Sequence, residues 1–148
     1  MVGFIGTKTV KLTEKNRVVI PKIFREGKDN LSFFLGTNQK NYCILHTEES
    51  WNDWQDYLQQ LQRLSEEVRD LFRLEFSNVI KLAADAQSRI ILPEQVLESL
   101  KLEVGVELVL VGVGDRIELW RKDVWQIYSK TKSKERSSII AKISMYGK

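Results

Sequence analysis

Hydrophobic and polar residues alternate along this chain of 148 residues in a pattern that occurs twice. Residues 8–12 alternate polar and apolar side chains, which predicts a half-buried strand, and the expected hairpin partner is a strand at 17–20. The segment Arg17-Val-Val-Ile-Pro21 returns 72 positions later as Arg89-Ile-Ile-Leu-Pro93, and these two segments hold the only prolines of the chain. A motif repeated in this way indicates two copies of one structural unit.

The segments after each proline keep the same order in both copies. Proline favours the start of a helix, so a short helix is expected after each one. Two apolar stretches, read as strands, and an acidic, tryptophan-containing helix start then follow. These elements are expected at 22–26, 31–36, 42–45 and 48–51 in the first copy and at 94–100, 106–112, 117–120 and 122–125 in the second. Gly112-Val-Gly114 stands where a hairpin turn would join the last two strands.

Apolar residues at steps of three and four predict two amphipathic helices between the copies. The first stripe comprises Trp51, Trp54, Leu58, Leu61 and Leu64, and the second comprises Val68, Leu71, Phe72, Phe76, Val79 and Ile80. Ser65, followed by two glutamates, is the expected N-cap of the second helix. Both stripes indicate packing in the core or between subunits. The tail at 129–148 is weakly amphipathic, and its sequence leaves open whether it docks on another subunit or stays mobile.

Composition restricts the class of protein further. With 43% hydrophobic and 29% charged residues, the chain has the profile of a compact globular domain. One cysteine, Cys43, and one histidine, His46, are too few for a disulfide framework or a His/Cys zinc site. The apolar stretches are shorter than the roughly 20 residues that span a bilayer, and the first ten residues lack the apolar core of a signal peptide. We therefore expect a cytoplasmic protein.

The net charge of +3 is distributed unevenly along the chain. Residues 1–47 hold eight Lys and Arg against three Asp and Glu, a net charge of +5, whereas residues 48–78 hold three against eight, a net charge of −5. Residues 79–128 hold six against eight, and residues 129–148 hold six against one. An acidic middle segment argues against a non-specific coat on nucleic acid and favours a DNA-facing surface on one side.

The sequence contains no combination of residues typical of a catalytic site. Nucleophilic catalysis needs a base beside the nucleophile, and the only imidazole, His46, stands at the end of a predicted strand. Acid pairs such as Glu48 and Glu49 stand at helix starts, where the helix dipole accounts for them. We predict that the protein is not an enzyme and uses no cofactor. An enzyme would instead show turnover that depends on His46 or Cys43.

Two polar turns at equivalent places are the candidate binding elements. Residues 13–17, Thr-Glu-Lys-Asn-Arg, match residues 85–89, Asp-Ala-Gln-Ser-Arg. An arginine just after a tight turn is held at the rim of a sheet, where its guanidinium can reach guanine edges or phosphates. The sequence alone leaves a second interpretation open, in which Arg17 and Arg89 form ion pairs with nearby acids such as Glu14 and Asp85.

At these residues the chain resembles the MraZ family of bacterial transcription regulators, relatives of the AbrB and MazE swapped-hairpin DNA-binding domains. The resemblance covers Phe4-Ile-Gly6, both Arg-x-x-x-Pro segments, Phe24-Arg25-Glu26, the helix at 67–73 and the stretch from Gly112 to Trp120. It implies an α+β fold in which two tandem AbrB-like split β-barrel units form a pseudo-twofold double-split barrel. The implied division is a first DNA-binding repeat at 5–50, a helical connector at 51–78, a second repeat at 79–123, and a C-terminal helix with a basic tail at 124–148.

The family motif Asp-x-Lys-Gly-Arg carries over onto both turns with departures. The first turn keeps Lys15 and Arg17 but has Thr13 and Asn16 in place of aspartate and glycine. The second turn keeps Asp85 and Arg89 but has Gln87 and Ser88 in place of lysine and glycine. Asparagine is the least costly non-glycine residue in a left-handed turn position, and serine tolerates that conformation less well.

The resemblance implies a repressor of the division and cell wall gene cluster, including its own promoter, which binds short direct repeats as a ring-shaped homo-oligomer in the cytoplasm and nucleoid. An oligomer is also expected because one subunit offers few DNA contacts, and linked sites add affinity. The expected DNA-binding residues are Lys15, Arg17, Arg89 and Gln87, with Lys8, Lys11, Lys22 and Arg25 in electrostatic support. Lys8 and Lys11 are equally well explained as solvated strand residues. The alternative function is a protein-binding regulator of antitoxin type with little DNA specificity.

Overall fold

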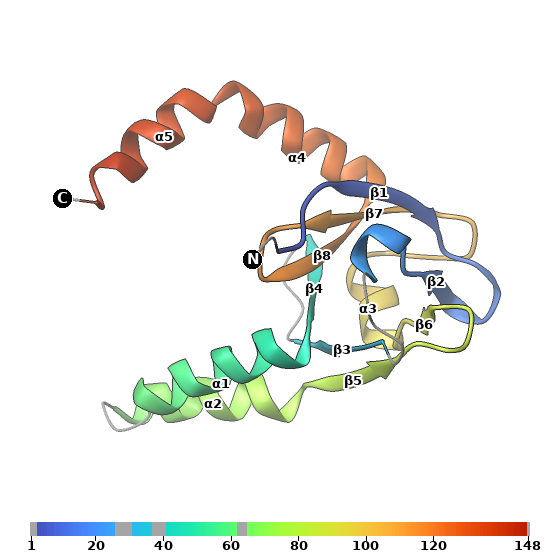
Figure 1. The fold of residues 1–148 in the computed structure, drawn as a ribbon, viewed down its shortest axis with the longest axis horizontal. Coiled ribbons are helices and arrows are strands. Elements are labelled where there is room, and N and C mark those ends of the chain that lie inside the picture. Colours follow the sequence, from blue (N-terminus) through green and yellow to red (C-terminus); the bar gives the residue numbers. More distant parts are fainter. Residues whose placement is uncertain (1–2, 26–30, 37–40, 62–64, 148) are drawn as a thin grey trace.

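The computed structural model describes residues 3–25, 31–36, 41–61 and 65–147, which form a mixed α+β fold (Figure 1). The strands are β1 (Thr7–Lys11), β2 (Arg17–Val19), β3 (Ser32–Leu35), β4 (Tyr42–His46), β5 (Ile80–Ala83), β6 (Arg89–Ile91), β7 (Glu107–Gly112) and β8 (Arg116–Arg121). The helices are η1 (Glu14–Asn16), η2 (Lys22–Phe24), α1 (Glu48–Leu61), α2 (Glu66–Ser77), α3 (Glu94–Ser99), α4 (Lys122–Lys134) and α5 (Arg136–Ser144). All the strand segments expected from the sequence are present, with ends shifted by one or two residues.

The two copies exchange strands. A six-stranded antiparallel sheet has the order β1-β7-β8-β4-β3-β5, and β2 pairs with β6 in a separate two-stranded sheet. The first strand of each copy therefore pairs with a strand of the other copy, β1 with β7 and β5 with β3. The expected hairpin between 8–12 and 17–20 is wrong. Only one bridge, Thr13 to Arg17, closes the turn. Beyond it β1 pairs with β7 and β2 with β6, because the apolar side chains of Val18 and Ile20 are buried in the core that both copies share.

The two-stranded sheet, called here the β2–β6 ribbon, has a symmetric register. Arg17 lies opposite Ile91, Val18 opposite Ile90, and Val19 opposite Arg89. Replacing each residue by its equivalent in the other copy, 72 positions away, gives the same set of pairs. Val18 lies opposite its own equivalent, Ile90. The ribbon is thus locally twofold in its pairing although its two strands differ in sequence.

The core fills the space between the ribbon and the six-stranded sheet. Val18 and Ile90 point into it and are fully buried, and the next alternate residues, Ile20 and Leu92, are buried as well. The sheet contributes the fully buried side chains Phe33, Leu35, Leu45, Leu108, Leu110, Ile117 and Leu119. Burying an aliphatic side chain of this size stabilises a fold by about 1.5–3 kcal/mol, so this shared core holds both copies together.

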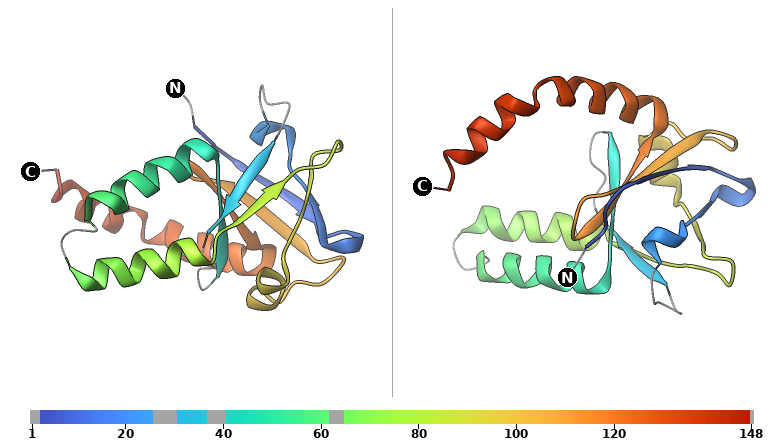
Figure 2. Two further views of the ribbon diagram at one scale, coloured as in Figure 1. Left: turned by 90° about the horizontal axis from the view of Figure 1, so that it is seen from below. Right: turned by 45° about the horizontal axis from the view of Figure 1, so that its top comes forward.

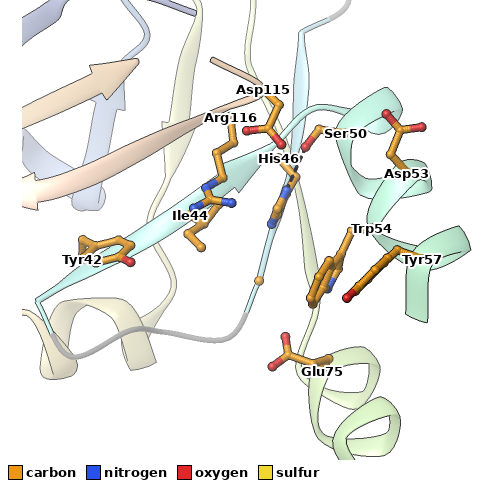
Figure 3. A pocket seen from close by; sticks show the side chains of 11 residues that line it. Tyr42, Ile44, His46, Ser50, Asp53, Trp54, Tyr57, Glu75, Asp115 and Arg116 are labelled. Carbon is orange, nitrogen blue, oxygen red and sulfur yellow. Dashed lines mark hydrogen bonds between the residues drawn. The ribbon is translucent and has the colours of Figure 1, made fainter. Parts of the chain in front are cut away.

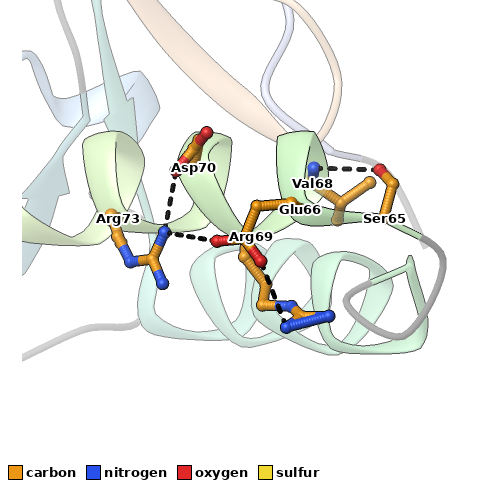
Figure 4. A network of polar contacts seen from close by, with 6 residues as sticks. All are labelled: Ser65, Glu66, Val68, Arg69, Asp70 and Arg73. Atoms are coloured by element: carbon orange, nitrogen blue, oxygen red, sulfur yellow. Dashed lines mark hydrogen bonds and ion pairs between the residues drawn. The ribbon is translucent and has the colours of Figure 1, made fainter.

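The predicted helical pair between the copies is confirmed as α1 and α2. The Ser65 Oγ accepts a hydrogen bond of 3.3 Å from the Val68 N–H, as expected for an N-cap, and Glu66 forms ion pairs with two arginines along the helix (Figure 4). Val79 and Ile80 do not continue this helix, which is a correction. The Asn78 side chain donates to the Leu74 carbonyl at 3.0 Å at the helix end, and Ile80 starts β5. Leu64 and Glu26 lie outside the described residues.

The helices after each proline and at the C-terminus also differ slightly from expectation. Pro21 and Pro93 stand one place before their helices in extended backbone, rather than in the first helical turn. The tail forms α4 and α5, called here the α4–α5 arm, which leads away from the β core (Figures 1 and 2). Every residue from Lys130 to Gly147 is exposed, so α5 buries no face against its own chain. No helix in the described residues is both long and apolar enough to cross a membrane.

Candidate nucleic-acid interface

The first turn, Thr13–Arg17, is closed by main-chain bonds and by a hydroxyl. The Thr13 N–H donates to the Arg17 carbonyl at 2.9 Å, and the Thr13 Oγ1 donates to the same oxygen at 3.1 Å. Lys15 and Asn16 have φ values of 61° and 56°. Two neighbouring non-glycine residues in the left-handed region make this a strained turn, since each such residue costs roughly 1–2 kcal/mol.

The second turn, Asp85–Arg89, is organised around a carboxylate. The Asp85 Oδ1 accepts hydrogen bonds of 2.9 Å from the main-chain N–H groups of Gln87 and Arg89, and its Oδ2 accepts one of 2.9 Å from the Arg89 Nε. The bond from the Arg89 N–H, with the guanidinium and the Gln87 N–H, holds the pKa of Asp85 below its usual value. Only Ser88 is left-handed among these five residues, with φ of 61°.

Each turn is fixed to the other copy by one main-chain hydrogen bond. The Asn16 carbonyl accepts from the Leu92 N–H at 2.9 Å, and the Ser88 carbonyl accepts from the Ile20 N–H at 2.8 Å. These four residues are pairwise equivalent under the repeat. All three ribbon views place both turns at the same end of the β core, on the side away from the helical pair and the α4–α5 arm (Figures 1 and 2).

The two arginines lie on the outward face of the β2–β6 ribbon. Their register sets Arg17 and Arg89 two residues apart along the ribbon, which corresponds to about 8 Å between their Cα atoms. Both side chains are half-buried. Arg89 forms the ion pair with Asp85 that the sequence left open, at 2.9 Å. Within the described part of the chain, Arg17 forms no ion pair, and its Nε donates to the main-chain carbonyl of Glu14 at 3.2 Å.

The other expected contacts lie at the turn tips or on the first copy. Lys15 and Gln87 are exposed at equivalent places in the two turns. Lys11 is exposed at the end of β1 nearest the first turn, and Lys8 lies three residues, or about 10 Å, further back. Lys22 is exposed at the start of η2. Lys11, Lys15 and Arg17 therefore lie near the first turn, whereas Lys8 lies away from both turns.

Arg25 takes a different place from the one expected. Its Nη1 donates to the Ser88 Oγ at 3.0 Å, so a residue of the first copy supports the second turn. The side chain is half-buried and its Nε is buried. The equivalent position in the second copy is Leu97, which packs in the core. Arg25 therefore braces Ser88, a residue whose hydroxyl is available because glycine is absent there.

Val19 and Ile91 are surface residues that sequence reasoning assigned to an apolar strand without distinguishing its faces. They share the outward face with Arg17 and Arg89, and 41% and 59% of their surface is exposed, against 0% for Val18 and Ile90. The alternation of faces along a strand could have separated them, because the arginines define the outward face.

His46 and Cys43, the two groups on which an enzyme would depend, lie in different surroundings, His46 in a pocket and Cys43 in the hydrophobic core. A pocket of about 430 Å³ between β4, β8 and the helical pair is lined by His46, Trp54, Tyr57 and Arg116 among others (Figure 3). His46 contacts the Ser50 Oγ through Nδ1 at 3.1 Å, and burial and the charge of Arg116 lower its pKa to about 4. Burial raises the pKa of the Cys43 thiol to about 12. The imidazole is therefore neutral and buried, and the thiol is not activated as a nucleophile.

Comparison with known proteins points to one family. A family model described as "MraZ protein, putative antitoxin-like" matches residues 76–143. A protein of Acetivibrio thermocellus named transcriptional regulator MraZ is 31% identical over 97% of this chain and 99% of its own length. Proteins of the same name from Ureaplasma urealyticum serovar 10 and Pelotomaculum thermopropionicum are 28% and 31% identical, over 97% and 95% of this chain and 99% and 94% of their own lengths.

Proposed function

The chain belongs to the MraZ family, and we propose that it is a transcriptional regulator that binds specific DNA sequences through the β2–β6 ribbon and its two turns. The observation that carries this proposal is the pair of arginines about 8 Å apart on one outward face. A two-stranded ribbon fits the major groove of B-DNA, and arginine is the side chain that most often reads guanine there.

The candidate residues are expected to make different kinds of contact with DNA. Arg17 has no acidic partner within the described residues and is free to make a bidentate contact with a base. Arg89 is held in place by Asp85 and can use its remaining guanidinium nitrogens toward DNA. Lys15 and Gln87 stand at the turn tips, and Lys11, Lys22 and Lys8 supply phosphate contacts or long-range attraction. Arg25 acts through Ser88 rather than on DNA directly.

The α4–α5 arm supports assembly of several copies. Helices of this length are marginal in water without a partner, yet α5 exposes Ile139, Ile140, Ile143 and Met145. The arm is basic, whereas α1 carries four acidic residues and no basic one. The arm of one copy can therefore dock on the helical pair of the next. Such a head-to-tail contact closes into a ring if its rotation allows, which would present several ribbons to successive direct repeats.

The finer expectations follow from the same proposal. We place the target at the promoter of the division and cell wall gene cluster, including the regulator's own gene, and the protein in the cytoplasm and nucleoid as a repressor. The exchange of strands between the copies supports a double-split barrel made from AbrB-like repeats at 5–50 and 79–123, with a helical connector at 51–78 and a helical tail at 124–148.

The test is a fluorescence-anisotropy titration of the full chain on its own upstream DNA and on a scrambled duplex, at two salt concentrations. Replacing Arg17 by alanine should cost about 1–3 kcal/mol in binding the upstream DNA, and Arg17→Ala/Arg89→Ala should abolish the preference over the scrambled duplex. Lys148→Ala, far from the ribbon in sequence, is the matched charge control. Equal binding of both duplexes by the unaltered protein, or unchanged affinity in a folded double variant, would overturn the proposal. A tight complex with another protein and no DNA preference would instead support a regulator of antitoxin type.

A further inference from the structure

We infer that Val19 and Ile91 contact thymine methyl groups in the major groove, which makes them specificity-determining residues beside the two arginines. The inference rests on the proposed function and deepens it. It starts from two side chains that the fold leaves exposed at equivalent places in a ribbon whose other face is completely buried.

The register puts all four side chains on one surface. Val19 lies directly opposite Arg89, and Ile91 directly opposite Arg17. Directly opposed residues in an antiparallel pair have Cβ atoms about 4.5–5.5 Å apart, so each apolar side chain is the nearest cross-strand neighbour of an arginine. Any duplex that approaches closely enough for the arginines to read base edges therefore also covers Val19 and Ile91.

The chemistry of the surface favours DNA over another apolar partner. Val19 and Ile91 lie beside the guanidinium groups of the two arginines. A protein that covered the apolar side chains would also bury these positive charges, which is costly unless the partner supplies acidic residues to pair with them. A major groove accepts both kinds of side chain at once. Guanine offers N7 and O6 to arginine, and thymine offers the only methyl group that projects into the groove from a standard base pair.

The two apolar side chains also differ in size, and this predicts a directional site. Isoleucine at 91 reaches one carbon further than valine at 19, so the half-sites read by the two strands need not be identical. A thymine beside each arginine-contacted guanine is the expected pattern, arranged about the twofold axis that runs between Val18 and Ile90.

The experiment removes the methyl groups from the DNA and from the protein separately. The upstream duplex is prepared once with thymidine and once with deoxyuridine throughout, which deletes only the 5-methyl groups, and both forms are titrated with the full chain by anisotropy. The proteins are the unaltered chain, Val19→Ala/Ile91→Ala, Arg17→Ala, and the control Val113→Ala. Val113 is also a 40% exposed valine, but it lies in the turn between β7 and β8, remote from the ribbon.

For the unaltered chain and Val113→Ala, we expect the uracil duplex to bind about threefold to tenfold more weakly, from the loss of one or two buried methyl contacts. Val19→Ala/Ile91→Ala should bind the thymine duplex more weakly and show a thymine-to-uracil ratio close to one. Arg17→Ala should lose affinity for both duplexes but keep the ratio. A scrambled duplex in both forms corrects for any general effect of the methyl groups on DNA shape.

Two results would overturn the inference while leaving the proposed function intact. One is specific, Arg17-dependent binding with equal affinity for the thymine and uracil duplexes. The other is a change of oligomer mass in Val19→Ala/Ile91→Ala, measured by light scattering, which would make this face a contact between copies. Binding that shows no preference for the upstream DNA in either form would overturn the inference and the proposed function together.

Discussion

The two copies of the repeat keep one arginine each but surround it with different chemistry. The first copy has Lys8, Lys11, Lys15 and Lys22 at positions where the second has Ile80, Ala83, Gln87 and Glu94. In the first turn the backbone is strained and held by a threonine hydroxyl, whereas in the second a carboxylate organises it and fixes Arg89. The two copies therefore contribute differently to the candidate DNA-binding surface. The first copy contributes most of the positive charge, and the second contributes a turn whose conformation is fixed before binding.

The difference extends to the sheet. In the β4–β8 pair, His46 at the end of β4 lies opposite Arg116, and Trp120 in β8 lies opposite Tyr42. His46 is a buried base beside Arg116, whereas Trp120 donates its Nε1 hydrogen to the Glu118 carboxylate at 3.0 Å. We therefore expect the loss of folding stability in acid to come from the first copy, through His46.

The largest expected effect is a loss of stability in acid through His46. Its pKa is about 4 in the folded chain and near 6.5 when unfolded, so the unfolded chain takes up the proton first as the pH falls. The contribution of His46 to the free energy of unfolding should be fully present above pH 6.5 and should fall by about 3 kcal/mol as the pH approaches 4, measured by urea unfolding. In His46→Asn this part of the pH dependence should vanish. An unaltered slope between pH 6.5 and 4 in that variant would show that another group is responsible.

Breaking the second turn should come next in size. Asp85→Ala removes the acceptor for two main-chain N–H groups and frees Arg89, so binding of the upstream DNA should weaken about tenfold, or about 1.4 kcal/mol. The matched change Thr13→Ala removes a single hydroxyl bond and should have a smaller effect. Asp85→Asn, which keeps an oxygen acceptor without the charge, should fall between them. Equal losses in Asp85→Ala and Thr13→Ala would remove the proposed contrast between the turns.

The smallest expected effect is on the salt dependence of DNA binding, and it tests whether the extra lysine of the first turn contacts phosphate. Lys15→Gln, which copies the second turn, should reduce the slope of log affinity against log salt by about one. The reverse change, Gln87→Lys, should increase the slope by about the same amount. The slopes come from anisotropy titrations at four or more salt concentrations on upstream and scrambled DNA. If Lys15→Gln left the slope unchanged, Lys15 would be a solvated residue and not a phosphate contact.

The sequence predicts the repeat, the strand segments, the helical pair and its Ser65 cap, because each depends on local pattern. It does not predict which strands pair. The hairpin expected between 8–12 and 17–20 fails because pairing is decided by where apolar faces are buried, and the other copy offers the better partner for both strands. For the same reason the helical stripe is extended too far, over Val79 and Ile80, whose apolar side chains suit a strand equally well.

The candidate site was partly accessible from the sequence. Both arginines and both turns were identifiable from the repeated motif, and their roles toward DNA remain predictions. The partner of Arg25 was not identifiable, since Ser88 lies 63 residues away and meets it only through the exchange between copies. The exposure of Val19 and Ile91 required knowledge of the face on which Arg17 lies, which the structure supplies.

The exchanged strands also set when this protein can fold. Thr7 pairs with Val111, and so the first strand finds its neighbour about a hundred residues later in the chain. Contacts of such long range slow folding, because the loop between them must close before the pairing can stabilise it. During synthesis, the N-terminal half emerges with an unpaired β1 and waits until β7 has left the ribosome. Neither half is a complete folding unit, and a ribosome that stalls between the two leaves a chain without a finished sheet.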